Sequence, residues 1–91
     1  MTERYDVLVR VVSQKGNCFQ NHKVGDEWIV SRKTPEGICL SAFSSIYPHI
    51  RILQLGGAFP WEKDDPHVTR EACPDPQNPV VFELRRLPNK Q

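Results

Sequence analysis

The sequence has no excess charge of either sign, no long apolar run and few aromatic residues. Twelve Lys and Arg residues stand against eleven Asp and Glu residues, and the formal net charge is +1. Because binding to nucleic acid or to anionic lipid usually draws on a basic surplus, we expect neither a nucleic acid nor a membrane as partner. No apolar run approaches the about twenty residues of a membrane-spanning helix, and the first residues lack the apolar stretch of a secretory signal. These absences predict a cytoplasmic protein.

Cysteine is also scarce, and its three residues are an odd number. In the reducing cytoplasm such a set does not predict a disulfide framework. The length of 91 residues allows one domain, 1–91, with a core over about 5–87 and a frayed tail at 88–91. A domain of this size buries only about 60–65% of the surface of its unfolded chain, so a metal staple would add useful stability.

Four segments have the β-branched and aromatic content typical of strands, and one has the periodicity of a helix. The short connections between them favour antiparallel hairpins. We therefore predict an α+β domain in which a small antiparallel sheet, in β-β-α-β-β order, is covered by one helical segment that a proline breaks. The predicted strands are residues 5–13, 28–31, 68–73 and 80–87.

The helical segment is predicted from a start signal, an apolar face and an end signal. Thr34 can cap a helix, Pro35 suits the first helical position, and Glu36 complements the helix dipole. Pro48 lacks a backbone donor, so we expect a kink or a break there, and the glycine pair at 56–57 ends the segment. The apolar positions at helical spacing are Cys39, Ala42, Phe43, Ile46, Ile50 and Leu53.

All three cysteines lie at the predicted ends of elements, where side chains from different segments can meet. Cys18 and His22 are four residues apart in the loop after the first strand, Cys39 lies near the helix start, and Cys73 ends the third strand. Three thiolates and one imidazole form a stable tetrahedral shell for zinc. We therefore predict that these four residues bind a metal ion, zinc in the first place and iron as the alternative.

Two other roles for the cysteines remain open. Free cysteine is often a small buried hydrophobe, and Cys39 continues the apolar face of the helix. Alternatively the protein is a thiol-dependent enzyme or redox protein, with Cys39 or Cys18 as nucleophile and His22 as base. A thiol at a helix N-terminus is favoured as thiolate by the helix dipole, which would suit Cys39.

A third function is a non-catalytic interaction module that uses the loop at 58–67. Trp61 is the large side chain of this loop. A lone loop tryptophan in a small domain more commonly closes the core, which is the placement we expect. An exposed Trp61 would instead favour a contact surface.

Several sequence blocks together resemble a family of short, uncharacterised bacterial and archaeal proteins of this length, known as an uncharacterised repeat-protein family. The blocks are Gly16-Asn-Cys18, His22-Lys-Val-Gly25-Asp26-Glu-Trp28, Gly37-Ile-Cys39-Leu-Ser-Ala42, Tyr47-Pro48, Gly56-Gly57-Ala-Phe-Pro60-Trp61, Cys73-Pro74-Asp75-Pro76 and Val81-Phe82-Glu83. The resemblance implies no particular activity, substrate or protein partner. Some family members carry the unit twice, which implies that a single copy such as this one self-associates as a homo-oligomer.

Overall fold

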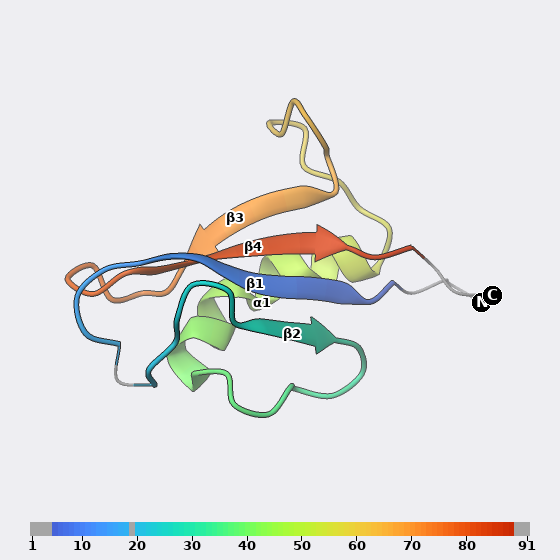
Figure 1. Cartoon of the computed structure of the whole chain (residues 1–91). Coiled ribbons are helices and arrows are strands. Elements are labelled where there is room, and N and C mark those ends of the chain that lie inside the picture. Colours follow the sequence, from blue (N-terminus) through green and yellow to red (C-terminus); the bar gives the residue numbers. More distant parts are fainter. Residues whose placement is uncertain (1–4, 19, 89–91) are drawn as a thin grey trace.

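The computed structural model describes residues 5–18 and 20–88. In this part of the chain four strands and one helix follow one another in β-β-α-β-β order (Figure 1). The predicted α+β class is therefore confirmed. No helix among these residues combines the length and the apolarity that crossing a membrane requires. The elements are β1 (Val7–Gln14), β2 (Glu27–Val30), α1 (Leu40–Gln54), β3 (Val68–Ala72) and β4 (Val80–Arg86).

The four strands form one antiparallel sheet in the order β2-β1-β4-β3. The two longest strands, β1 and β4, pair with each other at its centre, and Val9 lies opposite Leu84. The register between them slips between Val11 and Ser13. The predicted pairing of the first two strands as an antiparallel hairpin is confirmed, with Val9 opposite Trp28. Because β4 pairs with β1, the last strand lies beside the first at the centre of the sheet, and β2 and β3 are the edge strands.

The helix covers one face of this sheet (Figure 1). Alternate residues of each central strand face it, so that Val9 and Phe82 are fully buried against Ile46 and Ile50 of α1. Burying one such side chain contributes about 1.5–3 kcal/mol, and the core therefore holds helix and sheet together. The full buried apolar set is Val7, Val9, Val11, Val30, Ala42, Ile46, Ile50, Leu53, Phe59, Val80, Phe82 and Leu84.

The predicted helix start at residues 34–36 is wrong. The helix begins at Leu40, and Cys39 is its N-cap with an extended backbone (φ −61°, ψ 133°). The reason is Gly37, whose φ of +91° lies in the left-handed region and interrupts any helix that started at Pro35. A side chain on Gly37 would contact the indole nitrogen of Trp28 at 3.7 Å, so the turn packs against β2.

The predicted break at Pro48 is also wrong, because α1 runs without interruption from Leu40 to Gln54. Pro48 removes the hydrogen bond to the carbonyl of Ser44 at a cost of about 3 kcal/mol. Both residues are exposed, so water can satisfy that carbonyl, and the buried Ile46 and Ile50 on the opposite face keep the helix docked. The helix ends as predicted, with Gly56 at a φ of +89° just after it.

Trp61 does not close the core, in contrast to the expected placement. Its side chain is 62% exposed and packs on Phe59 with a ring-centroid separation of 5.2 Å, while Phe59 itself is buried. The phenyl ring of Phe59 is therefore part of the core, and the indole of Trp61 covers this ring on the solvent side. Exposure of Trp61 is what an interaction module would require, and that alternative stays a prediction. The predicted frayed tail lies outside the described residues except for Pro88.

Candidate functional site

The four predicted metal ligands line a single hollow of about 410 Å³. Cys18 and His22 come from the loop between β1 and β2, Cys39 caps α1, and Cys73 directly follows β3. These segments meet at the end of the sheet where β1 and β3 end and β2 and β4 begin (Figure 1). Sequence separations of up to 55 residues, from Cys18 to Cys73, are therefore closed by the sheet and the helix.

His22 is held in one orientation by burial, a hydrogen bond and an aromatic contact. Its side chain is buried, its Nε2 accepts a hydrogen bond of 3.1 Å from the backbone N–H of Cys39, and its ring lies edge-on to Trp28 at 5.0 Å. Burial lowers the pKa of His22 below its ordinary value of 6.5, although the charge of Asp26 acts in the opposite direction. The imidazole is therefore neutral near pH 7, as a metal ligand must be, and its free electron pair is directed at Cys39.

Cys39 stands at the positive end of the helix dipole. No side chain caps the first turn of α1, and that turn contains no acidic residue. The N–H groups of Ser41 and Ala42, which have no intrahelical partner, lie beside the hollow. A negative charge in the hollow would be stabilised by this helix end, by about 0.3–1 kcal/mol at an exposed site. The helix end therefore contributes a positive potential at the hollow.

Cys73 is fixed by the turn that follows β3. Its Sγ accepts a hydrogen bond of 3.3 Å from the backbone N–H of Val80 and lies 3.9 Å from the carbonyl oxygen of Asn78. The backbone N–H of Cys73 also donates to the carbonyl of Val80. The thiol is thus built into the β3–β4 hairpin, and Cys73 lines the hollow.

Asn78 is a residue of the site that the sequence pattern did not reveal. Its Oδ1 accepts a hydrogen bond of 2.8 Å from the backbone N–H of Asn17, and its Nδ2 donates to Asp75 at 3.2 Å. A side-chain bond from Asn78 and a backbone bond from Gln77 lower the pKa of Asp75, so this carboxylate stays ionised and holds the amide. The network joins the turn before Cys18 to the turn after Cys73. The part of it that can be recognised in the sequence is Asp75, which lies in a proline-rich turn.

The cysteines and the histidine are near one another but are not yet gathered around one point. In residues 5–18 and 20–88 no three or more His, Cys, Asp or Glu side chains are placed closely enough to hold a metal ion. Nε2 of His22 and Sγ of Cys73 are both occupied as hydrogen-bond acceptors. Metal binding here would require these groups to exchange N–H donors for the ion and to draw together.

The arrangement also bears on the thiol-enzyme alternative. A general base needs a free electron pair directed at the thiol whose proton it removes. The pair on Nε2 of His22 is instead directed at the backbone N–H of Cys39. Activation of Cys18 or Cys39 by His22 would therefore need a rearrangement of the ring.

Comparison of the chain with known protein families, with curated proteins and with solved structures finds no match. The family resemblance and the self-association that it implies stay predictions.

Proposed function

We propose that this protein binds one zinc ion through Cys18, His22, Cys39 and Cys73. The observation that carries the proposal is that all three cysteines of the chain and its one buried histidine line the same hollow. Three cysteines placed for packing alone would have no reason to line one hollow together. Their supporting groups, a neutral imidazole and an uncapped helix end, both favour a shell of thiolates and imidazole.

Zinc in this position would tie three segments of a small domain together. These segments are the loop before β2, the start of α1 and the end of β3, whose cysteines are only partly buried against the core. A metal ion that links segments far apart in the sequence stabilises a fold more than one that links near neighbours, because the loops that it closes are longer. The proposed role of the ion is therefore to stabilise the folded structure, and its binding free energy adds to that of folding.

Metal analysis of the purified protein tests the proposal. The protein is expressed without added metal, and the content of zinc and of iron is measured per chain. We expect about one equivalent of zinc, lost together with thermal stability on treatment with a chelator. Less than about half an equivalent of any metal, with unchanged stability in chelator, would contradict the proposal.

Cobalt substitution then identifies the ligands. Cobalt(II) bound to thiolates gives a charge-transfer absorption in the near ultraviolet that grows with the number of sulfur ligands. Single replacements of Cys18, Cys39 or Cys73 by Ser should each weaken this band, and His22→Gln should alter the visible bands that report geometry. The matched control is His67→Gln, because His67 lies outside the hollow. Equal spectra for the control and all four variants would contradict the ligand assignment.

A further inference from the structure

A second hollow, on the other side of the fold, gathers positive charge beside aromatic rings. It has a volume of about 350 Å³ and lies between the segment that follows β2 and one stripe of α1. Three cationic side chains, Arg32, Lys33 and Arg51, line it together with the rings of Phe43 and Tyr47. Among the residues that the structure describes, no carboxylate lines this hollow. It shares no lining residue with the proposed zinc site.

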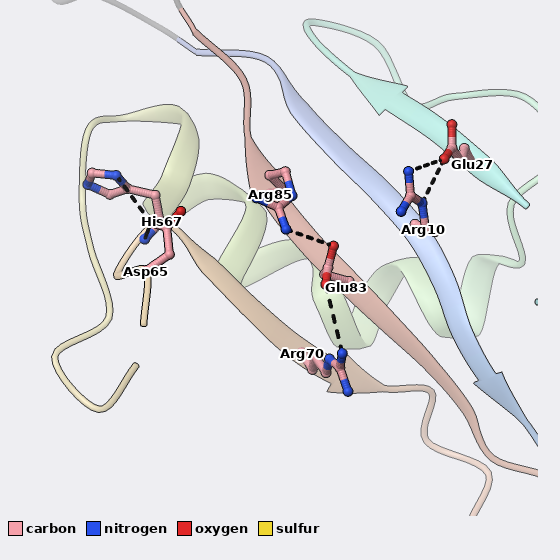
Figure 2. A network of polar contacts seen from close by, with 7 residues as sticks. All are labelled: Arg10, Glu27, Asp65, His67, Arg70, Glu83 and Arg85. Carbon is pink, nitrogen blue, oxygen red and sulfur yellow. Dashed lines mark hydrogen bonds and ion pairs between the residues drawn. The ribbon is translucent and has the colours of Figure 1, made fainter. Parts of the chain in front are cut away.

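The absence of a carboxylate here contrasts with the uncovered face of the sheet. On the uncovered face of the sheet three arginines each lie within 4 Å of Glu27 or Glu83, as Figure 2 shows. Within residues 5–18 and 20–88, Arg32, Lys33 and Arg51 form no ion pair. The charge of Arg51 suits its place in the last turn of α1, but that does not explain why two further cations gather beside it.

The guanidinium of Arg51 is also held in place by a buried polar group. Nη1 of Arg51 donates a hydrogen bond of 3.0 Å to Oε1 of Gln54, whose side chain is 96% buried. Nε2 of Gln54 in turn donates to the carbonyl of Ser31 at 2.7 Å. The buried amide therefore links the helix to the segment after β2 and fixes the guanidinium, which keeps its other N–H donors for a ligand.

From these observations we propose that this hollow binds a small aromatic phosphate monoester, such as a nucleoside monophosphate. A phosphate monoester carries a charge of about −1.5 to −2 near neutral pH, which three cations match better than the single charge of a carboxylate. A guanidinium binds two phosphate oxygens in parallel. Tyr47 is 46% exposed and lies 5.8 Å from Phe43, so the two rings form a wall on which a flat ring can stack. The volume falls at the lower end of the range for small-ligand pockets.

Titration calorimetry with four probes tests the phosphate and the ring separately. The probes are adenosine monophosphate, phenyl phosphate, adenosine and inorganic phosphate. We expect adenosine monophosphate and phenyl phosphate to bind, each at least about tenfold more tightly than adenosine or inorganic phosphate, because each of the latter lacks one part of the recognised group. Equal affinity for all four probes, or no binding at millimolar concentration, would overturn the proposal.

Three variants place the binding in this hollow. Arg51→Gln should lower the affinity for adenosine monophosphate by about tenfold or more, because the hydrogen-bonded ion pair between guanidinium and phosphate is lost. Tyr47→Ala changes a half-exposed side chain. It should lower the affinity for adenosine monophosphate and leave the affinity for inorganic phosphate unchanged. The matched control is Arg85→Gln, an exposed arginine on the uncovered face of the sheet. A loss of affinity in the control that equals the loss in Arg51→Gln would show that binding follows net charge and would overturn the assignment.

Discussion

The side chain of Asn78 accepts a hydrogen bond from the backbone N–H of Asn17, which lies 61 residues earlier in the chain. This contact joins the turn before Cys18 to the turn after Cys73. Asn78→Ala removes it together with the bond to Asp75, so we expect the free energy of unfolding to fall by about 1–2 kcal/mol. Affinity for zinc should fall as well, because Cys18 and Cys73 are no longer held together.

The matched control is Asn17→Ala, since that variant keeps the backbone N–H that donates the bond. Chemical unfolding and competition with a metal-binding dye measure the two effects for both variants. If Asn17→Ala lowers stability and zinc affinity as much as Asn78→Ala, the contact does not position the cysteines.

Gly16 and Gly25 provide a comparison between a crowded and an open turn. Both have a positive φ, +70° and +100°, so alanine at either position strains the backbone by about 1–2 kcal/mol. A Cβ on Gly16 would clash with Oδ1 of Asn78, whereas a Cβ on Gly25 would meet no atom of the described residues within 4 Å. We therefore expect Gly16→Ala to destabilise the fold by about 1–3 kcal/mol more than Gly25→Ala.

The double variant Gly16→Ala with Asn78→Ala separates crowding from backbone strain. Removing the Asn78 side chain relieves the clash, so the double variant should be less destabilised than the sum of the single changes. Thermal unfolding of the four proteins measures this. Strict additivity would show that Asn78 moves aside at no cost and that the two turns are not tightly packed.

Much of the fold could be predicted from the sequence because each strand carries its own local signal. The alternation of Val80, Phe82 and Leu84 marks the buried face of β4, and the structure buries all three. The helix start was mispredicted because Thr34, Pro35 and Glu36 match a start signal that Gly37 overrides. Pro48 was mispredicted as a break because the compensating contacts of α1 with the sheet are tertiary and have no local pattern.

The convergence of the cysteines was only partly predictable. Their place at the ends of elements suggested that they could meet, and they do line one hollow. The contact of Asn78 with Asn17 depends on the pairing of β1 with β4, which no short sequence window contains. The hydrogen bond from Cys39 to His22 was missed for a related reason, since it requires the exact position at which α1 begins.

Two isoleucines of α1 test whether packing on the sheet holds the helix across Pro48. Ile46 is fully buried, while Ile52 is 40% exposed. Ile46→Ala leaves a cavity against the sheet and should cost about 2–5 kcal/mol, whereas Ile52→Ala should cost much less. Helical circular dichroism during unfolding should also be lost earlier in Ile46→Ala. Equal effects of the two changes would mean that the helix is stable by itself and that docking does not compensate for the proline.

The depressed pKa of His22 predicts a pH dependence of the metal-free protein. In the unfolded chain the imidazole titrates near its ordinary value of 6.5, while burial lowers its pKa in the folded chain. Between the two values the unfolded state binds more protons, so the free energy of unfolding rises with pH through this window. The stabilisation is complete above 6.5 and is lost as the pH falls toward the folded pKa. Urea unfolding from pH 5 to pH 8 in the presence of a chelator measures it.

His22→Gln isolates this contribution from those of the carboxylates. The glutamine oxygen can still accept the hydrogen bond from the backbone N–H of Cys39, but the side chain does not titrate. The stability of His22→Gln should therefore depend less on pH below 6.5 than that of the unmodified protein. If His22→Gln keeps the full slope, another group causes the pH dependence and His22 is not held neutral by burial.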